Sequence, residues 1–424
     1  MAETVTERRS SQPYFVLMAL MAGLLAGAGA AGLAEGYKSG LLGTADFVGG
    51  LWLNGLKMTV VPLVVALLVV GIAAGAQAAQ AGRVAGRAVM WIVAICTLSA
   101  LVGALLIELL TTAFPLARET AIALQNGLAG IDQTATSGPL PSAVDFFKAI
   151  VPANIVAAAA NGDVLPLVVF ALLFAVALSQ IATERRQQIV GLFQGIADAM
   201  LVIIGWVLWL APLGVFALAF TVGASAGTAA FAGLGHYILL VSAVGAIVTL
   251  AAYPLAVLVG GIAPGRFVRC MIAPQSVAIS TRSSLACLPA MLTAARSMGV
   301  RNEVADVTLP LAVALFRATG PAMNTAVAFY VAHWLSLDPS MPQMIAAVAV
   351  GAIMSYGAIS LPGEVSFISS IAPVAMALGV PIAPLALLVA VEMVPDIFRT
   401  LGNVTMDVAL TAVVSSNVTE PDGL

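Results

Sequence analysis

The sequence has few charged residues, and this shortage excludes most soluble proteins. Of its 424 residues 9% are charged, where a soluble domain has about 25%. Hydrophobic residues make up 61%, and such an excess cannot be hidden in one water-soluble core. The formal net charge of −3 provides no basic surface for nucleic acid, so we expect no nucleic-acid partner. The composition therefore indicates an integral membrane protein.

Cysteines and histidines are too few and too scattered for a disulfide framework or a zinc site. The three cysteines lie in or beside apolar stretches without metal-ligand spacing, and the two histidines lie in different regions. The sequence contains no H-E-x-x-H motif and no P-loop, which a metalloprotease or an ATP-driven pump would need. A G-x-S-x-G pattern at 223–227 ends an apolar span with no strand before it, and we interpret it as a small-residue loop. We expect no enzymatic activity and no cofactor.

Long apolar runs dominate the first 262 residues. A membrane-spanning helix needs about 20 apolar residues, because its backbone polar groups must be satisfied within the helix. We expect a cytoplasmic tail over 1–12, helices 1 and 2 within 13–76, helix 3 within 77–117, a polar extracellular loop over 118–146 and helices 4–6 within 147–262. The Lys and Arg residues of the short loops place the N-terminus in the cytoplasm. The sequence thus predicts a multi-pass protein of the inner (plasma) membrane, embedded in the lipid bilayer, with both termini cytoplasmic.

The C-terminal third alternates polar-centred segments with spanning segments. Residues 263–300 carry serines at their centre and arginines at both ends, which predicts a re-entrant hairpin that enters from the cytoplasm. Residues 340–378 have the same form without basic ends, so this hairpin should enter from outside. We expect helix 7 within 301–336, helix 8 within 380–416 and a cytoplasmic tail over 417–424. The predicted fold is an all-α integral membrane protein with eight transmembrane helices and two re-entrant helical hairpins in an inverted repeat, an arrangement typical of transporters.

Helix 8 carries polar side chains that a lipid-facing helix could not tolerate. At 3.6 residues per turn, six of them form a stripe about 80° wide: Glu392, Asp396, Arg399, Thr400, Asn403 and Asp407. A charge at the bilayer centre costs about 2.5–3.5 kcal/mol, so the stripe must face protein or water. Three acids and one base leave the stripe anionic, which suits cations, while the arginine suits a carboxylate.

The hairpin centres complement this stripe. A broken helix at mid-membrane presents free N–H groups and the positive end of its dipole, which suit a carboxylate. Ser283-Ser284 lies at one tip and Pro362-Gly363 at the other. Two alternatives to a binding site remain. The charged stripe could form an internal salt bridge between Arg399 and Asp396, and the small residues of the tips could serve close helix packing.

Six motifs along nearly the whole chain resemble the dicarboxylate/amino acid:cation symporters, a family that includes the glutamate transporters. They are I-V-P-A-N (150–154), A-N-G-D-V-L-P (160–166), A-P-L-G-V-F-A (211–217), R-S-S-L-A-C-L-P (282–289), L-P-G (361–363) and D-I-F-R-T-L-G-N-V-T-M-D (396–407). Each motif alone is weak, but six in the family's order are specific. The resemblance implies a secondary active symporter for a small organic anion.

The resemblance also implies roles for individual residues. Asp396 would hold the α-amino group of the substrate, and Arg399 would hold its side-chain carboxylate. Asn403 and Asp407 would bind sodium. The residues expected to bind substrate are Arg282, Ser283, Ser284, Arg317, Leu361, Pro362, Gly363, Asp396, Arg399, Thr400 and Asn403. These roles favour glutamate or aspartate as substrate; a proton-coupled C4-dicarboxylate transporter and a passive anion channel remain as alternatives. Members of the family are homotrimers in which the transport half slides like an elevator against a static scaffold.

The sequence departs from the family pattern where the coupling ion binds. The family's seventh helix unwinds at N-M-D-G-T, but this chain has F-R-A-T-G at 316–320, followed by Pro321. In the third helix, the family's Tyr, Thr and Ser align roughly with Ile92, Ile95 and Cys96, with Thr97 adjacent. We therefore expect altered or reduced sodium dependence, with sodium or a proton as the coupling cation.

Three ionisable residues could compensate for the missing ion ligands. Arg317 either offsets the charge of Asp407 or its neighbours, contacts a substrate carboxylate, or pairs with Glu364. Glu364 and Glu392 are candidates for proton coupling, because a buried carboxyl group can exchange a proton.

Overall fold

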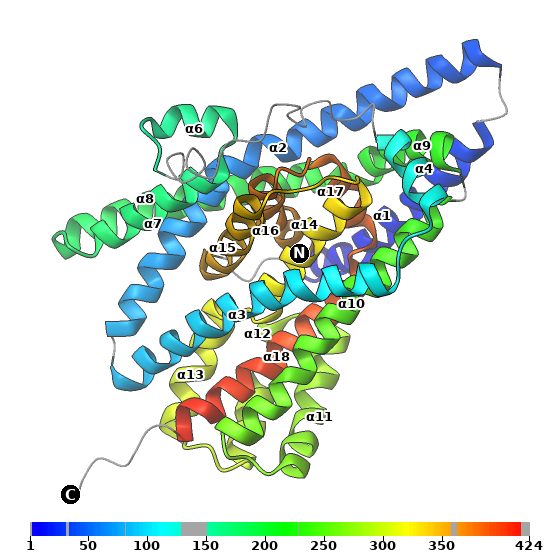
Figure 1. The fold of residues 1–424 in the computed structure, drawn as a ribbon. Helices are drawn as coiled ribbons and strands as arrows, with labels where there is room; N and C mark the ends of the chain where they lie inside the picture. Colours follow the sequence, from blue (N-terminus) through cyan, green and yellow to red (C-terminus); the bar gives the residue numbers. More distant parts are fainter. Residues whose placement is uncertain are drawn as a thin grey trace, which may run out of the picture.

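Helices form the regular structure of the described chain, which in this computed structural model covers residues 2–30, 34–80, 82–128, 151–227, 229–357 and 363–416 (Figure 1). The N-terminal half contains α1 (Ala2–Ala30), α2 (Glu35–Gln80), α3 (Arg83–Ala113), α4 (Arg118–Leu128), α6 (Ile155–Asn161), α7 (Val164–Leu178), α8 (Thr183–Trp209) and α9 (Ala211–Ala226). The C-terminal half contains α10 (Ala229–Pro254), η1 (Leu255–Val259), α11 (Pro264–Thr281), α12 (Ser284–Ser297), α13 (Asn302–Leu315), α14 (Thr319–Trp334), α15 (Met341–Gly357), α16 (Gly363–Leu378), α17 (Ala383–Leu388), η2 (Val389–Val391) and α18 (Met393–Ser416).

Five helices of the described ranges are long and apolar enough to cross a membrane: Gly36–Ala79, Arg83–Ala113, Thr183–Trp209, Ala229–Val259 and Met393–Ser416. Some long apolar runs of the sequence consist of consecutive shorter helices. The apolar run at 195–224 is interrupted after Trp209, where α9 begins with Pro212 in its first turn. Proline lacks the N–H that would continue the hydrogen-bond ladder of α8. The all-α architecture agrees with the prediction, but several of its spans are composite.

Part of the loop expected at 118–146 is helical. Arg118–Leu128 forms α4, which packs against α9 and α10. Its alanines, leucines and glutamine favour helix, and Glu119 lies in the first turn, where the helix dipole stabilises a negative charge. The prediction of a polar loop over 118–146 did not include this helix, because the polarity of the segment was taken to indicate a loop although its residue types favour helix.

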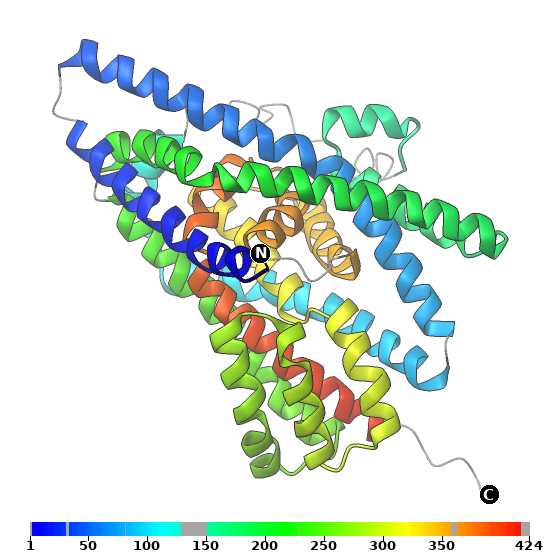
Figure 2. The same cartoon turned by 180° about the vertical axis from the view of Figure 1, so that it is seen from behind.

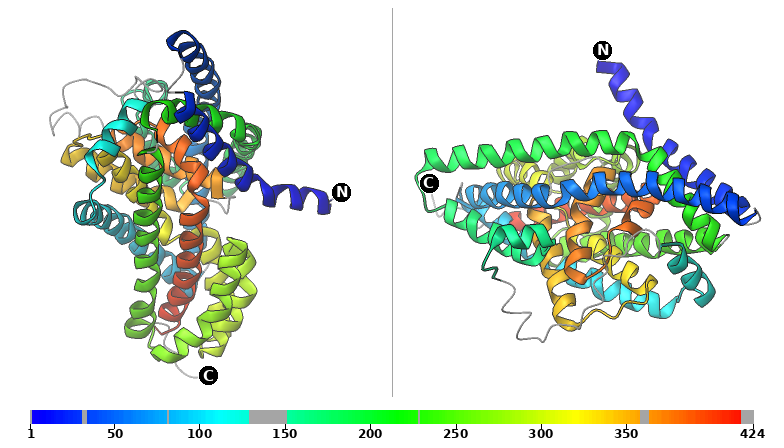
Figure 3. Two further views of the ribbon diagram at one scale, coloured as in Figure 1. Left: turned by 90° about the vertical axis from the view of Figure 1, so that its right-hand side faces the viewer. Right: turned by 90° about the horizontal axis from the view of Figure 1, so that it is seen from above.

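The helices form two groups on either side of α3 and α14. On one side, α1 packs against α9 and α2 packs against α8 and α9; Figure 2 shows α2 and α8 as two long helices alongside each other. On the other side, α18 packs against α10, α11, α12 and α13, and Figure 3 shows α10 and α18 side by side. Gly103 of α3 lies directly against the backbone of Ala322 in α14, so a larger residue there would force the two helices apart.

Broken helices surround α18. Helices α11 and α12 pack against each other as one hairpin, and α15 and α16 as a second hairpin whose connection, 358–362, lies outside the described residues. Residues 316–318 interrupt the expected helix 7 between α13 and α14. The expected helix 8 is likewise divided into α17, η2 and α18. These interruptions place helix ends and polar side chains around the most buried helices, α14 and α18.

Candidate substrate and ion site around helix α18

The polar stripe of the last helix points into the protein. All six of its side chains are buried, from Asp407 with no exposed surface to Arg399 at 9%: Glu392, Asp396, Arg399, Thr400, Asn403 and Asp407. Glu392 lies just before α18 in helical geometry, and the N–H of Asp396 donates to its carbonyl at 2.8 Å. The stripe therefore continues one residue beyond the helix end without a change of direction.

Arg399 pairs with Glu392 and not, as one alternative proposed, with Asp396. Its Nη2 donates to Oε1 of Glu392 at 2.8 Å, and its Nη1 donates to Oδ1 of Asn324 in α14 at 2.8 Å. The hydroxyl of Tyr237 in α10 donates to the other carboxylate oxygen of Glu392 at 3.2 Å. Three helices thus hold one guanidinium in a fixed orientation, and such charge-assisted hydrogen bonds are among the strongest in proteins.

Asp396 faces the tip of the first hairpin. Nη1 of Arg282 lies 3.9 Å from Oδ2 of Asp396. Arg282 adopts a left-handed conformation with φ 50°, which ends α11 and turns the chain directly into α12. The hydroxyl of Ser283 caps α12 by accepting the N–H of Ala286 at 3.4 Å. The tip of this hairpin and the acidic side of the stripe therefore come together, as the sequence suggested.

The lower part of the stripe meets the interruption between α13 and α14. Oδ1 of Asn403 accepts two hydrogen bonds from Thr319, one from its backbone N–H at 3.0 Å and one from its hydroxyl at 2.6 Å. Asp407 lies one helical turn further, fully buried, and no hydrogen-bond donor of the described residues contacts either of its carboxylate oxygens. Arg317, in the interruption itself, attracts this carboxylate electrostatically.

Most of the tip of the second hairpin lies outside the described residues. Leu361 and Pro362 lie outside the described residues, and Gly363 begins α16. The side chain of Glu364 is also outside the described part, so the pairing of Glu364 with Arg317 and the role of Glu364 in proton coupling stay predictions. Thr400 is buried beside Arg399 on α18. The structure thus brings the tip of the first hairpin next to the polar stripe of α18. The place of the second tip in the site stays a prediction.

Comparison with known proteins places this arrangement in a family. A sequence model described as "Sodium:dicarboxylate symporter family" matches residues 13–417, nearly the whole chain. The chain belongs to this family. Individual relatives are distant but similar over most of their length, so the symporter family is assigned to the chain as a whole and not to one segment.

Relatives of this symporter-family protein carry names from two substrate classes. A "Proton/sodium-glutamate symport protein" of Bacillus subtilis (strain 168) is 27% identical over 370 residues, which cover 87% of this chain and 85% of the relative. A "Proton/glutamate-aspartate symporter" of Escherichia coli (strain K12) is 27% identical over 380 residues, 87% of this chain and 84% of the relative. A "C4-dicarboxylate transport protein 2" of Ralstonia nicotianae (strain ATCC BAA-1114 / GMI1000) is 26% identical over 416 residues, 96% of this chain and 90% of the relative.

The family name includes sodium, and the side chains around Asp407 fit a sodium ion poorly. Hard cations take several oxygen ligands, yet the amide oxygen of Asn403 already accepts two hydrogen bonds from Thr319. Phe316 and Ala318, which stand at the interruption of the seventh span, have hydrocarbon side chains and are buried. Of the two residues expected to bind sodium, Asn403 and Asp407, only Asp407 has side-chain oxygens that accept no hydrogen bond from the described residues. The assignment of Asn403 and Asp407 to sodium therefore stays a prediction that the geometry does not favour.

Several residues of the symporter's site were missed by reasoning from sequence. Asn324 and Tyr237 complete the Arg399–Glu392 group, and Thr319 binds Asn403. Gln275 of the first hairpin donates from Nε2 to the hydroxyl of Thr405 on α18 at 3.0 Å. Each is an uncharged polar residue within a helix that also carries many apolar residues. Such residues rarely face lipid, and that was the signal available in the sequence.

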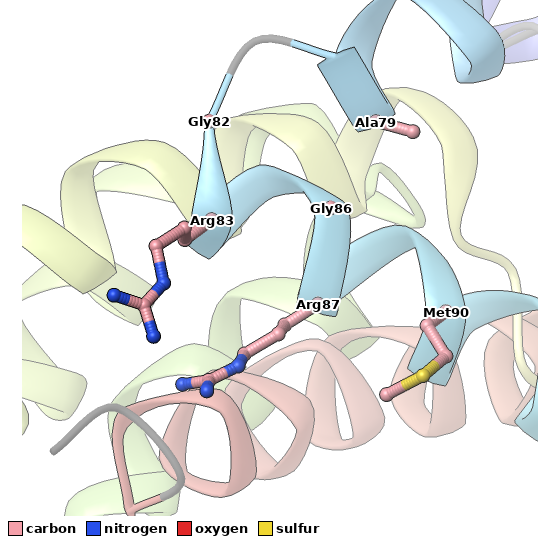
Figure 4. A pocket seen from close by; sticks show the side chains of 6 residues that line it. All are labelled: Ala79, Gly82, Arg83, Gly86, Arg87 and Met90. Carbon is pink, nitrogen blue, oxygen red and sulfur yellow. The ribbon is translucent and has the colours of Figure 1, made fainter.

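A cavity elsewhere in the symporter is separate from this site. It has a volume of about 530 Å³ and lies where α2 turns into α3 (Figure 4). Arg83 and Arg87 extend from the first turns of α3 on its edge, and Gly82 and Gly86 leave room between the helices. None of the residues that line the cavity belongs to the group of side chains described around α18.

Proposed function

We propose that the protein is a secondary active symporter that carries a small acidic substrate, glutamate or aspartate, together with a cation. The observation that carries this proposal is the buried, oriented guanidinium of Arg399 between Glu392 and Asn324. A guanidinium has five N–H donors in a planar fork. Glu392 and Asn324 engage two of these donors among the described residues, so others can form the bidentate contact that a carboxylate favours.

The acidic side of the pocket would recognise the substrate's amino group. Asp396 and Arg399 are three residues apart on α18 and therefore face the same side of the helix. An acidic amino acid can place its side-chain carboxylate on Arg399 and its ammonium on Asp396. Ser283, which caps α12 at the tip of the first hairpin, would close over the main carboxylate together with the second hairpin, and the N-terminus of α12 favours a negative charge there.

The charge balance of the site supports coupling to a cation. Among the described residues it contains three carboxylates and three guanidinium groups, namely Glu392, Asp396, Asp407, Arg282, Arg317 and Arg399. An acidic amino acid with one net negative charge would disturb this balance in a buried site, where an uncompensated charge costs several kcal/mol. A cation that enters with the substrate restores it. The proposed coupling cation is a proton or sodium, with reduced sodium dependence, and Glu392 and Glu364 are the proposed proton carriers.

The assembly and the movement are proposed from the family resemblance. We infer a homotrimer in the inner membrane with both termini in the cytoplasm, in which the hairpins, α13, α14 and α18 move as an elevator. Exposed apolar side chains support this arrangement, because α2 and α8 present Phe47, Leu51, Leu192, Trp206 and Trp209 on the molecular surface. Faces of this kind fit lipid or a neighbouring subunit.

Uptake into liposomes tests the proposed function. The purified protein is reconstituted, and labelled glutamate, aspartate and succinate are offered under an inward proton gradient, an inward sodium gradient or neither, with protein-free liposomes as control. We expect glutamate or aspartate to accumulate above the outside concentration under at least one gradient. Accumulation of succinate alone would favour the C4-dicarboxylate alternative. Mere equilibration under every gradient would indicate a passive anion channel, because a channel cannot concentrate its substrate.

A further inference from the structure

We propose that Arg317 is a built-in counter-cation for Asp407 and takes the electrostatic place of a bound sodium ion in this protein. The proposal concerns the ion and not the substrate; only its transport readout rests on the proposed cation-coupled symport. It follows from three features of the region where α13, α14 and α18 meet.

The first feature is the isolation of Asp407. Its side chain has no exposed surface, and neither carboxylate oxygen receives a hydrogen bond from the described residues. A buried carboxyl group without hydrogen bonds stays ionised only if a positive charge lies nearby, because it otherwise takes up a proton to avoid a desolvation cost of several kcal/mol. Among the described residues, the charged group that acts on this carboxylate is Arg317.

The second feature is the position of Arg317 at a helix end. Helix α13 ends at Leu315, Phe316 is extended, and α14 begins at Thr319, so Arg317 lies in the middle of the interruption. The last carbonyl groups of α13 carry the negative end of the helix dipole, which stabilises a cation at that point. Arg317 is partly buried there, and its attraction to Asp407 links the interruption to α18.

The third feature is the closure of the interruption by α3. The hydroxyl of Ser99 donates to the carbonyl oxygen of Ala318, which occupies one of the two lone pairs that this oxygen could offer to an ion. The thiol of Cys96 contacts the backbone of Arg317 and lies 3.4 Å from the hydroxyl of Ser355 in the second hairpin. Phe316 and Ala318 fill the space with hydrocarbon. Fixed contacts of the protein thus occupy the interruption, and a permanent charge supplies what an ion would supply.

Thermal unfolding in detergent, with sodium replaced by choline at constant ionic strength, tests the proposal without transport. A ligand that binds only the folded state stabilises it by RT ln(1 + [L]/Kd) and therefore raises Tm as its concentration exceeds Kd. We expect the Tm of the wild-type protein to depend on sodium much less than that of a variant without the Arg317 charge. The Arg317→Met variant keeps an unbranched apolar stem, loses the charged guanidinium group and should gain a Tm that rises with sodium. In liposomes the same variant should lose uptake in sodium-free buffer and recover it as sodium is added.

The double variant Arg317→Met/Asp407→Asn is the matched control, because it removes both charges and with them the need for a cation. It should be insensitive to sodium in Tm and should fold even if Arg317→Met alone does not. A wild-type Tm that rises with sodium as steeply as that of the Arg317→Met variant would overturn the proposal. So would an Arg317→Met variant that shows no sodium effect, or one whose only change is a higher KM for substrate at every sodium concentration, which would make Arg317 a substrate contact. A failure of uptake with the expected Tm pattern would contradict the proposed substrate and leave the counter-cation intact.

Discussion

Replacing Arg399 with methionine should abolish the uptake of acidic substrates. The guanidinium is the oriented, buried cation of the pocket, and truncating one partner of a buried charge pair costs about 2–5 kcal/mol, or roughly 30- to 4,000-fold in affinity. The measurement is the initial rate of labelled glutamate and aspartate uptake into liposomes over a range of substrate concentrations. Arg399→Lys should recover only part of the activity, because an ammonium group cannot form the bidentate contact.

The same substitution should also destabilise the protein, and a control separates the two effects. Without Arg399, Glu392 remains buried with Tyr237 as its hydrogen-bond partner, and an uncompensated buried charge costs about 3–5 kcal/mol. The double variant Arg399→Met/Glu392→Gln removes both charges and should regain most of the lost Tm while remaining inactive. Uptake that returns together with stability would show that Arg399 supports the fold and does not bind substrate.

Replacing Asp396 with asparagine should change substrate preference from acidic amino acids to dicarboxylates. The substitution removes the proposed partner of the substrate's ammonium and releases Arg282, which lies 3.9 Å away. A second substrate carboxylate could then use the freed guanidinium. We expect the ratio of glutamate to succinate uptake to fall by about 10- to 100-fold, which corresponds to about 1.4–2.8 kcal/mol of differential binding.

Asp306→Asn provides a matched control for this experiment. Asp306 also pairs with an arginine, since Arg296 donates to it at 2.6 Å, but both side chains are about half exposed on the surface. Exposed ion pairs of this kind contribute about 0–1 kcal/mol. The control should transport like the wild-type protein. If Asp396→Asn keeps the wild-type ratio of glutamate to succinate, the assignment of Asp396 to the amino group is wrong.

The broad architecture was accessible from sequence because membrane insertion imposes strong rules. Apolar run length and the polar centre at 276–284 were enough to predict helices and the first hairpin. The spacing from Glu392 to Asp407 likewise predicted one helical face, and all its members are buried. These inferences needed only periodicity and the cost of placing charge in lipid.

The partners of these residues could not be predicted, because they come from distant parts of the chain. Tyr237 is 155 positions from Glu392, and Asn324 is 75 positions from Arg399. The sequence around Arg399 does not indicate which carboxylate pairs with it. Its pairing with Glu392 and not with Asp396 depends on how α10 and α14 pack around α18. Composite spans were also missed, because hydropathy does not distinguish a continuous helix from two helices with a proline between them, as at Pro212.

A structure of the protein in lipid with aspartate bound tests the central claim most directly. The account predicts that Arg399 holds the side-chain carboxylate of the ligand and that Asp396 holds its ammonium group, beneath the Ser283 tip of the first hairpin. Arg399 would keep its contact with Asn324. A ligand bound elsewhere, with Arg399 engaged only by Glu392 and Asn324, would contradict the account.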